Sequence, residues 1–163
     1  MLCGVIYTYM EKFSKITEEL GKPIKIGLDL HGVIDAMPEF FAFFTKAIIN
    51  AGGEIHILTG GTTEKDVQLL NDYNIKWTHF FSISDFHREK GTPTEGLHPK
   101  YGFPQISDYE WDRTKGDYCK KWGIDLHIDD TLAYNDYFST PFCRMWSHNN
   151  KPKGKHKDPR HLP

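Results

Sequence analysis

Three apolar segments of the chain end in side chains that could perform chemistry. Asp29 ends the run IKIGLD, Thr59 ends EIHILT, and Asp129 with Asp130 follows LHI. In open α/β sheets, ligands bind beyond the carboxyl ends of the strands, so we expect these groups to gather at one edge. Carboxylate oxygens are the ligands that Mg²⁺ prefers, and backbone amides such as that of Gly60 can hold phosphate oxygens.

Further residues extend this set. Lys115 lies near the start of a predicted helix that precedes the last acidic strand, and it adds a positive charge near the same edge. Lys121 is an alternative for that charge. The backbone amide of Gly61 can hold phosphate oxygens in the same way as that of Gly60. The pattern therefore indicates a site for a divalent cation and a phosphoryl group.

The elements that would position these groups alternate between strand and helix. Short apolar runs predict buried parallel strands at residues 24–30, 54–59, 77–83, 124–128 and 141–146. Helical spacing of apolar residues predicts helices at residues 11–20, 38–51, 63–73 and 114–122, and Thr63 with Asp66 resembles a capping box. The alternation predicts an α/β fold, a Rossmann-like three-layer α/β/α sandwich with a mostly parallel sheet.

A single domain is predicted over residues 1–146, followed by a basic tail at residues 147–163. The tail holds five Lys or Arg against one Asp, although the whole chain carries a net charge of −2. Its Pro- and Lys-rich composition predicts a flexible, solvated segment. Between residues 84 and 112 no regular element is expected, and this segment is either a lid or specificity loop or a solvated loop.

Composition indicates a soluble globular protein. The chain has 163 residues, of which 39% are hydrophobic, and no apolar run approaches the roughly 20 residues that cross a bilayer. The first ten residues lack the basic start of a secretory signal. Cys3, Cys119 and Cys143 have no CxxC spacing, which predicts reduced thiols in a cytoplasmic protein. The sequence makes no prediction of the oligomeric state.

The order and spacing of the motifs resemble the haloacid-dehalogenase-like superfamily, of the small type without a large cap domain. The first motif of that superfamily normally reads Asp-x-Asp-Gly-[Thr/Val]. Its four motifs match, in chain order, Asp29 with Gly32-Val33, then Thr59, then Lys115, and finally Asp129-Asp130. The resemblance covers residues 24–146.

What the resemblance implies is a Mg²⁺-dependent phosphohydrolase that cleaves a phosphomonoester in two steps. Asp29 would attack phosphorus and form an aspartyl-phosphate, which water then hydrolyses. Thr59 would hydrogen-bond the phosphoryl group, and Lys115 would neutralise its charge and orient Asp29. The implied ligands of Mg²⁺ are the carboxylates of Asp29, Asp129 and Asp130 and the main-chain carbonyl of His31. A small phosphorylated substrate, such as a nucleotide or a sugar phosphate, would suit so open a site.

One position departs from the pattern of that superfamily. Its general acid is a second Asp, two residues after the nucleophile, and here that position is His31. An imidazole with a pKa of about 6.5 can carry the same proton near neutral pH. Two interpretations stay open: His31 is the proton shuttle, or it is a positional residue and hydrolysis is lost or altered. In the second case the chain is a phosphate-binding or regulatory protein.

Other interpretations of single features also stay open. The basic tail could bind nucleic acid, although the acidic remainder of the chain argues against it. Asp130 could cap the segment that follows it, and Asp35 is expected to be a loop or capping residue. His79, His87 and His98 match no compact zinc-ligand pattern and are expected to be surface or packing residues.

Overall fold

Five parallel strands form the central sheet of the computed structural model, which describes residues 21–99 and 102–146. Their order across the sheet is β3-β2-β1-β4-β5. Their bounds are Lys25–Leu28 (β1), Glu54–Thr59 (β2), His79–Ser82 (β3), Leu126–Asp129 (β4) and Phe142–Arg144 (β5). The chain builds outward from β1 to β3 and then returns to the other side of β1 with β4. This reversal creates a switch point between β1 and β4, where α/β sheets bind ligands.

The alternation of side chains along β2 divides the core between two faces of the sheet. Ile55 and Ile57 belong to one buried cluster, together with Leu28 of β1. Leu58 belongs to a second buried cluster, together with Cys119. Because successive side chains of a strand point to opposite faces, His56 lies on the same face as Leu58.

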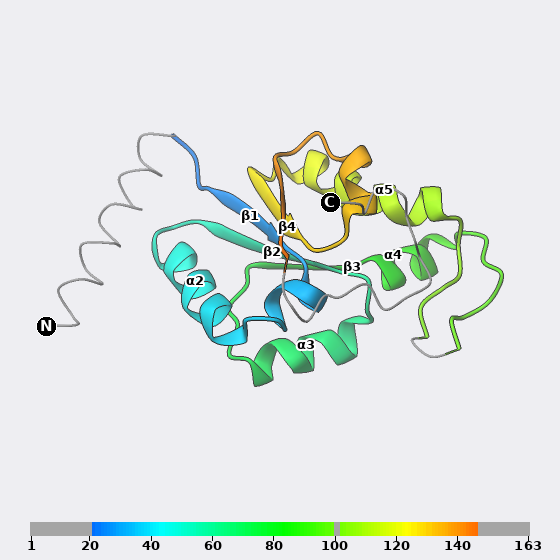
Figure 1. Cartoon of the computed structure of the whole chain (residues 1–163), viewed down its shortest axis with the longest axis horizontal. Coiled ribbons are helices and arrows are strands. Elements are labelled where there is room, and N and C mark those ends of the chain that lie inside the picture. The colour runs from blue at the N-terminus through cyan, green and yellow to red at the C-terminus, as the bar shows by residue number, and fades with distance from the viewer. Residues whose placement is uncertain (1–20, 100–101, 147–163) are drawn as a thin grey trace, which may run out of the picture.

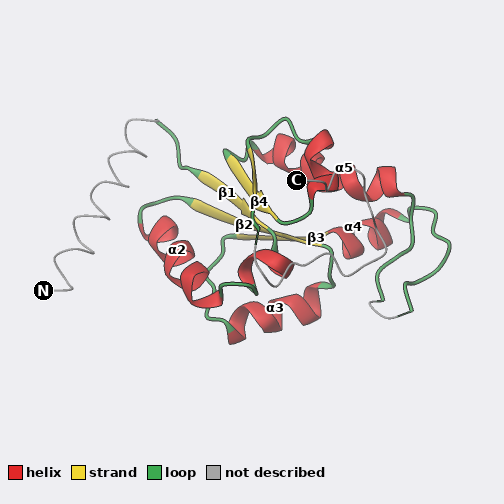
Figure 2. Ribbon diagram, in the orientation of Figure 1, coloured by secondary structure: helices red, strands yellow, loops and turns green. Residues whose placement is uncertain are grey.

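Helices cover both faces. The helices α2 (Pro38–Asn50) and α3 (Thr63–Asp72) add Phe41, Ile48 and Leu70 to the first cluster. The helix α5 (Asp108–Trp122) adds Cys119 to the second cluster, and α4 (Ile83–Lys90) lies beside α5. Figures 1 and 2 show α2 and α3 on one side of the sheet and α5 on the other. The protein therefore has three layers, α/β/α.

The predicted Rossmann-like α/β fold is confirmed, and the strand predicted at residues 54–59 has those bounds. The strands predicted at residues 24–30, 77–83 and 141–146 are each shorter in the structure, and Ile83 already belongs to α4. The predicted helix at residues 11–20 and the basic tail lie outside the described residues. Within the described ranges, no helix has the length and apolar character to cross a membrane.

The expectation of no regular element between residues 84 and 112 is wrong. The helix α4 occupies residues 83–90, and α5 begins at Asp108 rather than at residue 114. The side chains of Ser82 and Ser107 cap these two helices by accepting backbone N–H groups of the first turn. Both helices contain many charged residues, so the helical spacing of their apolar residues is not evident from the sequence. Between them, the described residues 91–99 and 102–107 form a loop in which Leu97 and Pro104 pair in an antiparallel bridge.

The contact between α5 and the 3₁₀ helix η2 (Leu132–Tyr137) can be tested at Gly116. A Cβ at Gly116 would overlap the carbonyl oxygen of Tyr137. Alanine normally stabilises a helix interior by about 0.8–1.0 kcal/mol relative to glycine. Because the overlap is with backbone, we expect Gly116→Ala instead to lower the free energy of unfolding, by about 1–3 kcal/mol.

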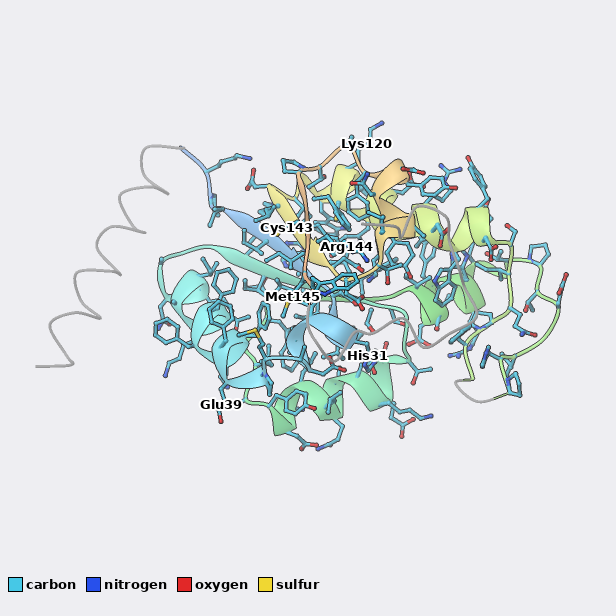
Figure 3. The ribbon with its side chains drawn as sticks, in the orientation of Figure 1. His31, Glu39, Lys120, Cys143, Arg144 and Met145 are labelled. Atoms are coloured by element: carbon cyan, nitrogen blue, oxygen red, sulfur yellow. The ribbon has the colours of Figure 1, made fainter. Side chains whose placement is uncertain are left out.

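Urea denaturation measures this change. Lys120→Ala, at an exposed position of the same helix (Figure 3), is the control and should stay close to wild type. A stabilised Gly116→Ala variant would contradict the close contact of α5 with η2.

Candidate active site

Asp29, Lys115 and Asp129 lie together at the switch point of the sheet. Asp29 follows β1, Asp129 ends β4, and the Asp29 N–H donates to the Ile128 carbonyl at 2.9 Å. The Lys115 Nζ lies 2.8 Å from Asp29 Oδ1 and 2.7 Å from Asp129 Oδ2. All three side chains are buried. One ammonium group therefore bridges two carboxylates that are far apart in the sequence.

The helix α5 and the ring of Tyr134 position this ammonium group. Lys115 lies on the buried face of α5, and its Nζ is 5.0 Å from the centre of the Tyr134 ring in η2. This distance is within the range of a cation–π interaction. The alternative, Lys121, is exposed on α5 and lines a different cavity, away from the carboxylates. The positive charge of the site thus belongs to Lys115.

Burial and neighbouring charges shift the two carboxyl groups in opposite directions. Burial raises the pKa of Asp29, Asp129 raises it further, and Lys115 only partly offsets the rise. Burial also acts to raise the pKa of Asp129, but Lys115 and His127 outweigh it and hold that pKa below its usual range. Burial alone would lower the pKa of Lys115, but the two carboxylates raise it, so its ammonium stays charged.

Asp129 is held by more than Lys115. His127 Nε2 lies 3.1 Å from its Oδ2, and the Thr131 N–H donates to its Oδ1 at 2.8 Å. Both oxygens are therefore fixed in place. His127 is itself fully buried, two residues earlier in β4.

Asp130 completes a set of three carboxylates. Donor oxygens of Asp29, Asp129 and Asp130 lie within 4.8 Å of one another. Three carboxylates face one ammonium group, and this excess of oxygen donors at one point fits a hard cation such as Mg²⁺. The alternative role of Asp130 as a helix cap is wrong, because η2 has Thr131 at its capping position and no side-chain cap bond.

Thr59 lies behind the wall of the site. Its hydroxyl donates to Asp66 Oδ2 at 2.6 Å and accepts the Gly61 N–H at 3.1 Å. Its side chain is fully buried, whereas Gly60 and Gly61 line the adjacent cavity. The structure therefore places the two glycines, rather than Thr59, on the surface of this cavity.

His31 lies on the loop after β1, between two carboxylates and beside α3 (Figure 3). Its Nε2 is 3.2 Å from Asp66 Oδ1, and its Nδ1 is 3.4 Å from Asp35 Oδ2. The hydrogen bond with Asp35, and then that with Asp66, raise the pKa of His31 to about 10. The other oxygen of Asp35 accepts the Gly32 N–H at 2.6 Å, so Asp35 also organises the loop.

Asp66 is a site residue that the sequence analysis missed. The predicted capping box of Thr63 with Asp66 is wrong, because Thr62 is at the capping position and no side chain caps α3. Asp66 instead points inward, is 4% exposed, and links Thr59 to His31. A signal was present in the sequence, because an acidic residue on the inner face of an amphipathic helix needs a polar partner.

A cavity of about 770 Å³ opens over these groups. Asp29, Lys115 and Asp130 line it at the switch point, and His31 lies at its edge near α3. Two aromatic rings form another part of the wall: Phe103 and Trp111 have ring centres 5.0 Å apart. The predicted lid segment therefore reaches the site through Phe103, and the first turn of α5 reaches it through Trp111.

The three histidines considered for zinc do not converge. His87 is buried and its two ring nitrogens bond the hydroxyls of Thr92 and Thr114. The ring of His98 lies against Phe103 at 4.8 Å, whereas the ring of His79 stacks on His56. The expectation of packing roles agrees with these contacts for His87 and His98.

The shifted pKa of Asp29 predicts how stability depends on pH without added metal. A carboxyl whose folded pKa is raised above its unfolded value of about 3.9 stabilises the fold at low pH, and that contribution is lost as pH rises. Asparagine does not titrate, so we expect the stability of Asp29→Asn relative to wild type to increase from about pH 4 upward.

Thermal unfolding of both proteins in chelator, across this pH range, gives the comparison. Asp117→Asn, at an exposed carboxylate of α5, is the matched control for replacing a carboxylate by an amide. A difference between Asp29→Asn and wild type that stays constant with pH would exclude a raised pKa at Asp29.

Neither a scan of protein families nor a search of curated proteins finds a similar sequence. The functional assignment therefore depends on the residues and contacts described above.

Proposed function

We propose that the protein is a Mg²⁺-dependent phosphohydrolase that cleaves a phosphomonoester through an aspartyl-phosphate on Asp29. The observation that carries this proposal is the buried bridge of Lys115 between Asp29 and Asp129. It lies at the switch point of a parallel sheet and faces a cavity lined by glycine backbone. Phosphoryl transfer depends mainly on positioning and on charge neutralisation, which such an arrangement supplies.

In the first step, Asp29 is the nucleophile. Lys115 binds Oδ1, so we assign the attack on phosphorus to Oδ2. The P–O bond to the leaving group breaks as the new bond forms, and the product is an acyl phosphate on Asp29. In the second step, water attacks this phosphorus and releases inorganic phosphate and the free carboxylate. Lys115 offsets negative charge in both steps.

Mg²⁺ is the cation that the three carboxylates suit best. Asp29, Asp129 and Asp130 would hold it, and the main-chain carbonyl of His31 is the fourth proposed ligand. When bound, the ion neutralises charge on the phosphoryl oxygens. Asp129 is already fixed through both of its oxygens, so its position needs little adjustment.

His31 is proposed as the proton donor to the leaving group. Its raised pKa means that it carries its proton at neutral pH, which is the state that a general acid needs. Asp66 and Asp35 hold the two ring nitrogens, about half of the side chain is exposed, and His31 lines the cavity. In the second step the neutral ring would accept a proton from the attacking water.

The residues that line the cavity support a small substrate that contains a ring. Phe103 and Trp111 offer aromatic faces on one wall, and Lys65 of α3 offers a positive charge on another. A phosphomonoester of a ring-bearing group, such as a nucleotide, could place its phosphate at Asp29 and its ring beside these faces.

A phosphate-binding protein without turnover is the second candidate. The observation in its favour is that both nitrogens of His31 are already within reach of carboxylates. A ring held in this way could serve only to fix the loop. The activity of the wild-type protein separates the two candidates.

The first measurement is release of inorganic phosphate from a panel of phosphomonoesters, with and without Mg²⁺. We expect metal-dependent turnover in wild type and a fall of roughly a thousandfold or more in kcat/KM for Asp29→Asn, because the nucleophile is lost. Asp117→Asn is the control for loss of a surface carboxylate and should keep wild-type activity.

Each outcome of that measurement has a clear meaning. Turnover that survives in Asp29→Asn would refute the aspartyl-phosphate. No turnover in wild type, with Mg²⁺ and phosphate still bound, would establish the second candidate instead. Absence of both turnover and Mg²⁺ binding would contradict both.

The role of His31 is tested by the leaving group. General acid catalysis contributes about 10²- to 10⁴-fold, and it matters most where the leaving oxygen is strongly basic. We therefore expect His31→Gln to lower kcat by about 10²-fold for an alkyl phosphate and far less for p-nitrophenyl phosphate. Equal losses for both substrates would assign His31 a positional role.

A further inference from the structure

A second cluster of ligating side chains lies at the opposite end of the sheet. Glu54 and His56 are at the start of β2, and His79 begins the neighbouring strand β3. His56 and His79 are register partners and lie on the face that α5 covers. Asp29 and Asp129 are at the carboxyl ends of their strands, so this cluster is separate from the candidate active site.

Two imidazole nitrogens and one carboxylate oxygen of these three side chains lie close to one another. Glu54 Oε2 lies 3.0 Å from His56 Nε2 and 3.8 Å from His79 Nδ1, and donor atoms of all three residues lie within 4.8 Å of one another. Two ligands of a tetrahedral zinc ion are about 3.3 Å apart, given bond lengths of about 2.0–2.1 Å. The two separations that involve Glu54 are thus close to those that one ion requires.

We propose that Glu54, His56 and His79 bind a first-row transition-metal ion, for which Zn²⁺ is the best fit. Imidazole ligands select Zn²⁺, Cu²⁺ or Ni²⁺ over Mg²⁺, so the two ends of the sheet bind different classes of metal. Three protein ligands leave one position of a tetrahedral ion for water. The proposal does not depend on the phosphohydrolase assignment.

His56 is oriented as a ligand. The ring is fully buried, and its Nδ1 lies 2.9 Å from the hydroxyl of Tyr118 on α5. Metal-binding histidines almost always have such a partner on the second nitrogen, which fixes the ring and directs the first nitrogen at the ion. Here the first nitrogen, Nε2, points at Glu54. The ring of Trp122 lies beside both histidines and shields this side.

Two adjustments accompany binding. The rings of His56 and His79 are parallel, with centres 4.1 Å apart, so one ion cannot lie in both ring planes. His79 is the ring that turns, because its side chain is 36% exposed. In turning, the ring gives up its stack on His56 and the contact of its Nδ1 with the Thr78 hydroxyl. The ammonium of Lys25, 3.3 Å from Glu54 Oε2, moves into solvent as the ion replaces its charge.

The ion would join β3, the edge strand of the sheet, to its neighbour β2. A ligand that binds only the folded state stabilises it, so Zn²⁺ should raise the melting temperature of the wild-type protein. This effect needs no contact with the candidate active site.

The test uses the full chain, freed of metal by chelation and held in excess Mg²⁺. Co²⁺ is the probe, because a tetrahedral Co²⁺ site has an intense visible absorption band and Zn²⁺ should abolish it by displacement. We expect saturation at one Co²⁺ per chain. We expect His79→Gln to weaken binding by about tenfold or more, since even an outer partner of a ligand contributes that much. His98→Gln and Asp29→Asn should bind as wild type does.

Glu54→Gln is a second variant, in case His79→Gln does not fold by circular dichroism, and it too should weaken binding. No visible band in wild type would overturn the proposal. Equal affinity in wild type, His79→Gln and Glu54→Gln would also overturn it, because the ion would then be held elsewhere. Loss of binding in Asp29→Asn alone would place the ion among the carboxylates of the other end and overturn it as well.

Discussion

The buried ion bridge of Lys115 with Asp29 and Asp129 is the interaction on which the arrangement of the site depends. Removing charges from water is costly, and mutual attraction offsets the cost only when the geometry is good. Here the ammonium group has both carboxylates within 2.8 Å, and Asp129 has further partners in His127 and Thr131. Loss of one member would leave uncompensated charge in the core, so α5 must stay in contact with the ends of β1 and β4. Burial, together with the neighbouring charge of Asp129, keeps the pKa of Asp29 raised in spite of Lys115, so the carboxylate needs further cationic partners.

Close approach of the backbone to carboxylates shapes the rest of the site. A Cβ at Gly32 would overlap the carboxylate of Asp130, and a Cβ at Gly61 would overlap that of Asp66. Gly32 also has a φ of 90°, which L side chains rarely adopt. Glycine at these positions lets the loops after β1 and β2 fold down onto the acidic groups. His31 is then held over the site by Asp66 from α3 and Asp35 from its own loop.

The two ends of the sheet carry different functional groups. Because the strands are parallel, their carboxyl ends lie together at one edge and their amino ends at the other, and different residues occupy each edge. At the carboxyl ends the side chains are carboxylates and one ammonium, which suit Mg²⁺ and phosphate. At the amino ends of β2 and β3 they are two imidazoles and one carboxylate, which suit a softer ion. The register of β2 with β3 stacks His56 on His79, and the helix α5 serves both ends, with Lys115 at one and Tyr118 at the other.

The sequence by itself determined the class of fold and the residues at the ends of the strands. Apolar runs that stop at Asp29, Thr59 and Asp129 are local patterns, and parallel topology then requires those ends to meet at one edge. Only the tertiary structure decided which other groups join them. Asp66 faces inward, Thr59 lies behind the cavity wall, and His79 meets His56, because helix rotation and strand register set these contacts. Such contacts depend on packing between segments distant in sequence, which local periodicity does not encode.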